Sequence, residues 1–466
     1  MNTESTFRKI SSGLVTSLFC FVILCALPAA RAQQPQANVW QGRLADGTVI
    51  GTNELAKILD AHGDWSVSGG TNGVRADLTR AVLTNVVLIN ADLEEAILGG
   101  VELSYANLNE AYLENAILTN ADLEQIQFTN ADLQGADLTE ATLRNANLSQ
   151  ADLSTANLSF ANLIGANLSQ AKLIDTSLTN SVISGADFTY TVATGASFEG
   201  SDLEGSDFSM ADLWGANFSE AVLWQVDFIG ANLSEADLTG SDVKGANFSH
   251  TIFELRSGAL PDIGSCAQAV NLSEMVYTNS PQALIELREA FAKAGLRQQE
   301  REVNYAIMHT RRVQAGVWEK TLLLAIEVPC AFGMQPGRPL KILFGLIFVF
   351  WIPYVVSLSR RSASGIWMIW PKDRAPQDPS NEKDVRLNPH SRWRILGIAL
   401  YFSLLSAFNI GWEDINIGTW IARIQPKEFT LKAIGWVRVV AGIQSLISVC
   451  MVALWIMSYF EHAFEF

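Results

Sequence analysis

The chain has 466 residues with a formal net charge of −16, and its hydrophobic residues, 49% of the total, are unevenly distributed. This length accommodates two or three domains, and the acidity disfavours binding to nucleic acid or to anionic lipid. Only three of the five cysteines lie outside the N-terminal apolar stretch, which is no disulfide framework, although a Cys266–Cys330 bridge is left open.

The first 32 residues have the pattern of a Sec-type signal peptide. Arg8 and Lys9 form a basic start, residues 14–27 are nearly all apolar, and residues 30–32 give a small-x-small site before Gln33. An uncleaved N-terminal anchor is the alternative. Both readings place the middle of the chain outside the cytoplasm.

Residues 33–75 are expected to form an N-terminal cap. Asn53 is predicted to cap a short helix from Glu54 to His62. The side chains predicted to turn inward from this helix are Leu55, Ile58 and Leu59.

Residues 76–253 repeat with a period of five. Steps of five from Leu78 to Phe253 give 36 positions, of which 35 are Leu, Phe, Ile or Val, the exception being Ala193. A small or β-branched residue stands two positions earlier, and Asp or Asn commonly lies between. Neither a helix, with a period of 3.6, nor a flat strand, with a period of 2, accounts for this spacing.

The A-D/N-L-x-x pattern, as in 91–95 and 156–160, resembles the pentapeptide-repeat family. That resemblance implies a right-handed quadrilateral β-helix of about nine coils, with four repeats per coil. The large and small positions then point inward, and neighbouring coils bury each other's apolar faces. Residues 20 apart should stack, so one wall holds a phenylalanine column and the opposite wall holds two more. These are Phe188, Phe208, Phe228 and Phe248, facing Phe198 and Phe218.

The outward positions of the repeat are strongly acidic. Residues 76–253 contain 25 Asp and Glu against four Lys and Arg, a net charge of −21. Trp214 and Trp224 each follow a large inward residue, so both are predicted to point outward and are candidate partner contacts.

Residues 254–336 are expected to form a helical adaptor that leads to the bilayer. Ser280 should cap a helix that has Pro281 at its first position and ends at Gly295. A second, longer helix is predicted over residues 297–325.

Residues 337–466 are predicted to form a transmembrane domain with two or three spans. The apolar runs are 340–358, 395–411 and 434–460, and the middle run either spans or re-enters. Seven basic residues in the loop 359–392 favour its cytoplasmic location. The expected site is thus a bacterial inner (cytoplasmic) membrane, with the β-helix on the periplasmic or extracellular side.

The segment after the middle run resembles the pore of two-helix potassium channels, whose filter reads T-V-G-Y-G-D. The residues carrying this likeness are Asn409, Ile410, Gly411, Trp412, Glu413 and Asp414. Asn409 replaces the filter threonine, and Glu413 replaces the second glycine, which permits the carbonyl-in backbone. The resemblance therefore implies a degenerate filter.

No motif for a catalytic site, a cofactor or a dedicated metal site is present. The sequence thus favours a non-enzymatic scaffold that presents an acidic rod to an unknown protein partner and is anchored in the lipid bilayer, with possible homo-oligomerisation through the membrane domain and no nucleic acid partner. One alternative is a subunit of an oligomeric ion channel. A second is a DNA-mimicking topoisomerase inhibitor, as known for some soluble pentapeptide-repeat proteins, but the signal peptide disfavours a cytoplasmic target.

Overall fold

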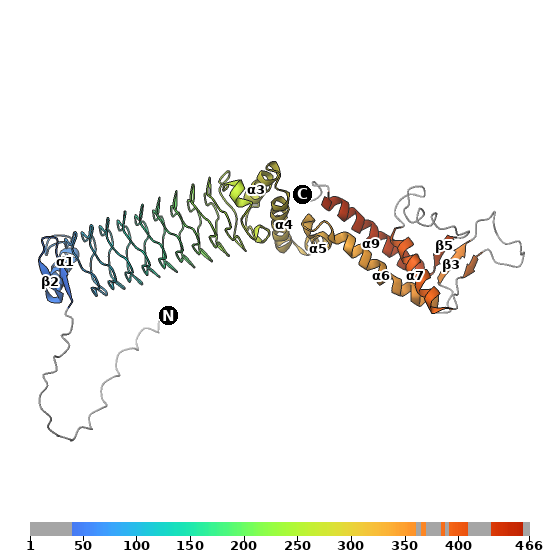
Figure 1. Cartoon of the computed structure of the whole chain (residues 1–466), viewed down its shortest axis with the longest axis horizontal. Coiled ribbons are helices and arrows are strands. Elements are labelled where there is room, and N and C mark those ends of the chain that lie inside the picture. The colour runs from blue at the N-terminus through green and yellow to red at the C-terminus, as the bar shows by residue number, and fades with distance from the viewer. Residues whose placement is uncertain (1–39, 360–364, 370–383, 387–390, 409–429, 460–466) are drawn as a thin grey trace, which may run out of the picture. The chain divides into compact units, whose positions relative to one another are not determined.

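The structure is a computed structural model that describes residues 40–359, 365–369, 384–386, 391–408 and 430–459 (Figure 1). The described elements belong to the unit Gln41–Phe466. The predicted signal peptide and the residues 409–414 lie outside the described residues.

A small hairpin and a helix precede the repeats. Strands β1 (Gln41–Arg43) and β2 (Val49–Gly51) pair antiparallel, and α1 (Thr52–Val67) follows. The Asn53 cap is wrong: α1 begins at Thr52, two residues before the predicted start at Glu54, and continues five residues beyond His62. The Glu54 carboxylate accepts a 2.9 Å hydrogen bond from the Gly51 amide. Of the three residues expected to turn inward, Leu55 is buried and the other two are half-buried.

Both parts of this segment contact the first coil. Arg43 and Val82 exchange two backbone hydrogen bonds of 2.9 and 2.7 Å. The buried Nδ1 of His62 accepts a 3.1 Å hydrogen bond from the Ala76 amide, and burial lowers the pKa of this imidazole. These contacts satisfy backbone groups that an exposed solenoid end would leave unpaired.

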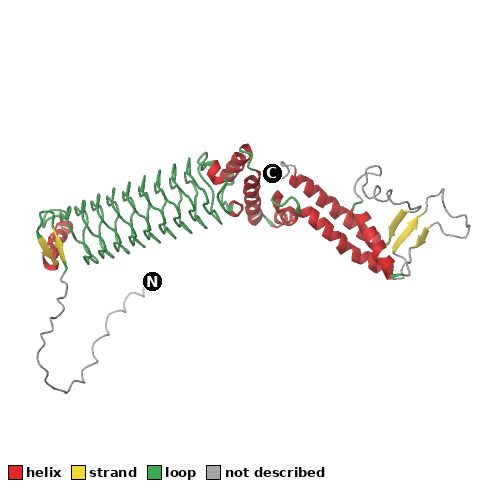
Figure 2. Cartoon of the chain, viewed as in Figure 1, coloured by secondary structure: helices red, strands yellow, loops and turns green. Residues whose placement is uncertain are grey.

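The repeats wind into a β-helix. Each outward residue just before a large residue forms a parallel bridge with the residue 20 positions later, without a break from Asp77↔Ile97 to Asn232↔Ile252. Figure 2 shows these coils as loops, because each wall contributes only an isolated bridge per coil. The predicted alignment of Leu93, Leu113 and Leu133 is confirmed by amide hydrogen bonds of 2.7–2.8 Å from each to the next coil.

The interior is filled as the period predicts. All 36 large positions are buried, and the most exposed, Leu88, is only 7% exposed. The small position is also inward, although Ala91 is only half-buried. Where this position is Ser or Thr, its hydroxyl donates to a backbone carbonyl, as from Thr251 to Phe228 at 2.7 Å. A buried hydroxyl without such a partner would be costly.

The predicted phenylalanine columns are present. Phe208 stacks on Phe188 with ring centroids 4.4 Å apart and on Phe228 at 5.7 Å. Phe198 and Phe218 meet Phe208 edge-to-face at 5.5 and 5.8 Å, from the opposite wall. Both geometries are favourable for aromatic rings.

Each coil turns its corners in one way. The second residue after every large position from Arg80 to His250 has a positive φ, and most of these residues are not glycine. The amide of the next residue donates to the carbonyl of the large residue, as from Ala81 to Leu78 at 3.0 Å, which defines a type II turn. The fivefold period is thus the spacing of these turns.

The winding continues irregularly after the repeats end. The bridges Asn247↔Val270 and Ile252↔Val276 replace the regular spacing of 20 with 23 and 24. The short α2 (Ile263–Cys266) and η1 (Leu272–Glu274) lie in this segment. The Cys266–Cys330 bridge is wrong: both thiols are free and buried, and burial raises the pKa of Cys266 to about 12.

Two predicted helices differ from the structure. Helix α3 is Gln282–Lys293, and its N-cap position is occupied by Pro281 rather than by Ser280. The Ser280 hydroxyl nevertheless accepts a 3.3 Å hydrogen bond from the Gln282 amide. Gly295, with φ of 73°, follows the helix as predicted. The single helix expected over 297–325 is instead two helices. These are α4 (Arg297–Gln314) and α5 (Val317–Cys330), followed by η2 (Ala331–Gly333). The break falls at Gly316, because glycine is unfavourable inside a helix.

Three apolar helices and a small sheet follow. The helices are α6 (Arg338–Ser359), α7 (Arg392–Ala407) and α9 (Trp436–Tyr459). The strands are β3 (Gly365–Ile369), β4 (Asp384–Arg386) and β5 (Thr430–Ile434), in the order β4-β3-β5. By length and composition, α6 and most of α9 could cross a membrane.

Candidate interaction surface

Three positions in every five face outward and form the surface of the β-helix. We name its four walls A, B, C and D after the inward residues that begin them, Leu78, Leu83, Leu88 and Leu93, each continued by every twentieth residue. The net charge of −21 over these repeats lies almost wholly on outward positions. Such a surface attracts cationic partners and repels other acidic ones.

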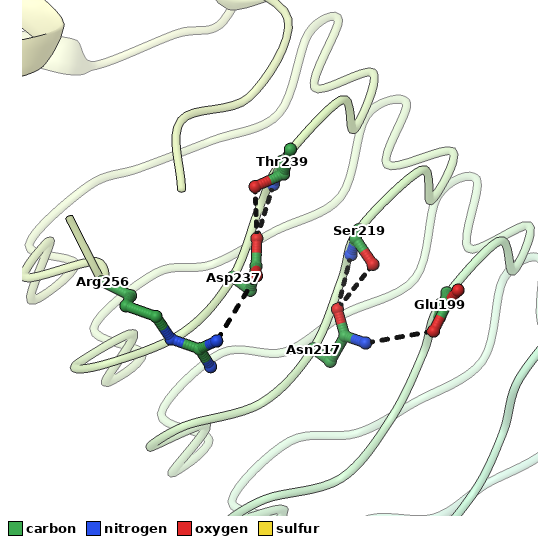
Figure 3. A network of polar contacts seen from close by, with 6 residues as sticks. All are labelled: Glu199, Asn217, Ser219, Asp237, Thr239 and Arg256. Carbon is green, nitrogen blue, oxygen red and sulfur yellow. Dashed lines mark hydrogen bonds and ion pairs between the residues drawn. The ribbon is translucent and has the colours of Figure 1, made fainter. Parts of the chain in front are cut away.

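Part of this acidity has a structural role. The Asp or Asn before a large residue accepts hydrogen bonds from the residue two positions later, which stabilises the turn. In Figure 3, Asp237 accepts hydrogen bonds from the amide and hydroxyl of Thr239 at 2.9 and 2.6 Å. Asn217 does the same for Ser219 at 3.0 and 2.7 Å. Asp and Asn therefore recur here because both form this local turn.

The same side chains also connect coils. The Asn217 amide donates to Glu199 on the preceding coil at 3.3 Å, and Arg256 lies 3.7 Å from Asp237 (Figure 3). Arg256 comes from the segment after the repeats, so wall A is tied to the C-terminal end of the β-helix.

An acidic stretch on wall D has little charge compensation. The pKa of Glu114 is raised, chiefly because its carboxyl hydrogen-bonds to Asp132, and then by charge repulsion from Asp132. Among the described residues of this wall, the one ion pair joins Lys172 to Asp152 on the preceding coil at 3.1 Å. Over the residues that the structure describes, no group of three or more side chains is arranged to hold a metal.

Trp214 and Trp224 point outward as predicted, being 51% and 40% exposed. They lie on walls D and B, half a coil apart, so they occupy opposite sides of the β-helix. The Lys244 ammonium lies 5.9 Å from the centre of the Trp224 ring. The two tryptophans therefore do not form one contact site.

The corners expose large apolar side chains that sequence reasoning missed. Tyr190 and Met210 occupy the corner between walls C and D on successive coils and are 60% and 54% exposed. The signal was available, since reading every twentieth residue at the corner position aligns these two.

The helices α6, α7 and α9 enclose a polar network. The Tyr354 hydroxyl donates to Gln444 at 2.7 Å, and the Gln444 amide donates to the Ser403 carbonyl at 2.9 Å. The Ser403 hydroxyl donates to the Ile347 carbonyl at 2.7 Å. Tyr354, Ser403 and Gln444 are at most 1% exposed, so their hydrogen bonds hold the three helices together.

The direction of α7 follows from its contacts. Trp351 Nε1 donates to the Leu396 carbonyl at 2.9 Å, and Ser403 contacts Ile347, so α7 runs antiparallel to α6. Strand β3 follows α6, β5 precedes α9, and the two strands pair from Gly365↔Ile434 onward. The start of α7 and β5 therefore lie at the same end of the α6–α9 pair.

The repeats, with a turn every five residues and a stacking contact every twenty, place the protein in the class of β-solenoids. The family described as "Pentapeptide repeats (8 copies)" matches residues 70–100, 106–145, 141–180, 181–219 and 216–254. The chain belongs to the pentapeptide repeat family, and its repeats form a right-handed β-helix.

Solved structures of other family members are similar to the repeat region. One is HetL, a pentapeptide repeat protein involved in heterocyst differentiation regulation, from the cyanobacterium Nostoc sp. strain PCC 7120. It is 30% identical to this chain, the match covers 41% of this chain and 91% of HetL, and the TM-score is 0.27. A pentapeptide repeat protein from the Arabidopsis thaliana thylakoid lumen is 27% identical over 32% of this chain and 83% of that one, with a TM-score of 0.14.

QnrB1, a plasmid-mediated fluoroquinolone resistance protein, is 24% identical over 40% of this chain and 86% of its own, with a TM-score of 0.31. No curated protein matches the chain.

Proposed function

We propose that this protein is an exported, membrane-anchored scaffold that presents a rod of about nine acidic coils to a protein partner. The observation that carries this proposal is the outer surface of the β-helix, which combines a net charge of −21 with exposed tryptophan, tyrosine and methionine side chains. Charge gives long-range attraction, and large apolar groups supply contact energy.

Membrane anchoring is supported by α6 and by Trp436–Ser458 of α9, the two helices with sufficient length and hydropathy. Helix α5 adds to this support, because it exposes a run of apolar side chains just before α6. Trp318 is 90% exposed, Val317 82% and Leu322 65%. A bilayer interface favours such side chains, tryptophan above all.

Export and orientation rest on the N-terminal signal pattern and on the basic loop 359–392. The test is protease digestion of intact spheroplasts. We expect the β-helix to be cut from outside while the loop stays protected until the membrane is opened. A β-helix protected in intact spheroplasts would contradict the proposal, and would restore the cytoplasmic DNA-mimic alternative.

The scaffold role is tested by placing a photoactivatable amino acid at outward positions of each wall in the full-length protein. We expect one wall to crosslink a protein reproducibly, with loss of the crosslink at 0.5 M salt. Uniform labelling of all four walls, or none, would contradict a specific partner.

A second candidate function is an oligomeric ion channel subunit, and the β3–β5 pairing favours it. A pore-forming loop must enter and leave the bilayer on one side. The residues between Arg392 and Thr430 begin and end at the same end of the α6–α9 pair, which supports re-entry over a third span. About 24 Å of helix, at 1.5 Å per residue, also makes α7 short for a full span.

Cysteine labelling separates the two topologies. In a background without native cysteines, re-entry predicts that Ser391→Cys and Thr430→Cys react from one side of the membrane and Gly337→Cys from the other. Reaction of the first two from opposite sides would establish a third span. Ion flux in liposomes, with Glu413→Gly for comparison, then tests conduction; if neither protein conducts, the channel function is wrong.

A further inference from the structure

Four exposed apolar side chains gather around the corner between walls C and D, and two more lie at the opposite edge of wall D, where the turn to wall A begins. All six come from four successive coils, and each is at least 37% exposed. We call the four at this corner, Tyr190, Val192, Met210 and Ile229, the C/D corner; the two at the far edge of wall D are Ile174 and Trp214.

The register of the coils makes these residues neighbours. Tyr190 and Met210 hold the same corner position one coil apart, a separation of about 4.8 Å between strands. A Cβ added to Gly230 would lie 2.6 Å from the Met210 sulfur, so the methionine lies over the next coil, beside Ile229. Val192 is the next outward residue after Tyr190 on wall D.

Wall D carries the patch onward. Residues 18 apart meet across coils, as Ser159 and Ser177 do at 2.8 Å between hydroxyls, and Ile174 has this relation to Val192. Trp214 lies on the same wall, two coils after Ile174 in the same column. Together the six side chains expose on the order of several hundred Å² of apolar surface, and the four of the C/D corner are its contiguous part.

The fold itself does not require apolar residues here. Tyr190 and Met210 have φ of 58° and 61°, where glycine is favoured and a bulky residue adds strain. Both also lose hydrophobic energy by facing water. Phe160 has the same backbone and the same 60% exposure as Tyr190, but the corner residues before and after it in its column, Glu140 and Asn180, are polar.

The charge around the C/D corner selects the partner. Within the described part of the chain, none of the acids bordering it is ion-paired with lysine or arginine, and the nearby Lys172 is already paired with Asp152. A second copy of this rod would bring like charges together, which is unfavourable. The bordering acids are Asp187, Asp207, Asp212 and Asp227.

We propose that the C/D corner is the docking site of a cationic protein segment, which inserts an apolar side chain among Tyr190, Val192 and Met210 while its lysines or arginines face the surrounding acids. This deepens the proposed scaffold function and rests on it. Burial of the aromatic and methionine surface supplies affinity, and the acids supply specificity and rate.

The test uses the full-length protein in nanodiscs of zwitterionic lipid, with binding to empty discs subtracted. The probes are three fluorescent twelve-residue peptides of alternating Lys and Trp, Lys and Ser, or Glu and Trp. We expect the Lys/Trp peptide to bind at least tenfold more tightly than either of the others. The double variant Tyr190→Ser with Met210→Ser should weaken it at least tenfold, and Phe160→Ser by less than twofold.

Each other outcome overturns the proposal in a recognisable way. Undiminished binding by the double variant, or equal loss in Phe160→Ser, would refute docking at this corner while leaving an acidic scaffold intact. Equal binding of the Lys/Trp and Lys/Ser peptides would show that charge alone acts. If the wild type binds none of the three, the scaffold function fails as well. If the full-length protein forms dimers and the double variant does not, the occupant of the C/D corner is a second copy of the chain. Amide exchange of the coils serves as the folding control.

Discussion

The phenylalanine columns predict where the β-helix is most stable. We consider Phe208→Leu, with Phe128→Leu as a matched control. Both phenylalanines are on wall C and fully buried, and leucine occupies other positions of that wall. Phe208 has four aromatic neighbours at 4.4–5.8 Å, whereas no aromatic ring pair involving Phe128 occurs among the described residues.

The expected magnitudes differ because of those neighbours. A near volume-conserving change to leucine costs up to about 1.5 kcal/mol at either position. Loss of aromatic pairs worth about 0.5–1.5 kcal/mol each adds to this at Phe208 only. Since the pairs share one ring and are not additive, we expect an excess of about 2 kcal/mol.

Local amide exchange is the suitable assay, because a solenoid's stability is a sum over repeats and their interfaces. Exchange is followed by mass spectrometry in peptides covering residues 183–233 and 103–153. An excess of about 2 kcal/mol corresponds to roughly 30-fold faster exchange around Phe208→Leu than around Phe128→Leu. Equal effects within about 0.5 kcal/mol would refute a stabilising role for the aromatic columns.

Three further changes have defined outcomes. Thr155→Gly should stabilise the β-helix by about 1 kcal/mol in urea unfolding, because Thr155 is β-branched at φ of 60°. Gly205→Ala should destabilise it by a similar amount, because Gly205 has φ of 67°, even though no atom lies within 4 Å of the added Cβ. Burial lowers the pKa of His62 below its unfolded value of about 6.5. Its contribution to the free energy of unfolding is therefore complete above that pH and is lost as pH falls through the folded pKa. Amide exchange in α1 should quicken at pH 5, and His62→Gln should remove that dependence. Glu254 accepts hydrogen bonds from the amides of residues 278–280 at 2.5, 2.5 and 3.1 Å, so Glu254→Ala should destabilise the start of α3 by about 1–3 kcal/mol, measured by exchange of its first amides; unchanged exchange would contradict the role.

The β-helix was predictable from the repeat pattern and its resemblance to a known family. A period of five predicts a backbone that turns every five residues, and the resemblance to the pentapeptide-repeat family implies four repeats per coil. The stacking of residues 20 apart and the phenylalanine columns follow from these two together. Local helices were less determined. The break at Gly316 and the caps of α1 and α3 depend on single residues and on competing hydrogen bonds, which a periodicity does not encode.

The grouping of exposed side chains on the surface could not be predicted from the sequence. Trp214 and Trp224 are ten residues apart in sequence but lie on opposite walls, whereas Tyr190 and Ile229, 39 residues apart, belong to one corner. The return of the chain to the β3–β5 end likewise depends on a pairing between segments 65 residues apart. The physical reason is that burial is fixed by a local repeat, while the neighbours of an outward side chain are fixed by how the coils and helices stack.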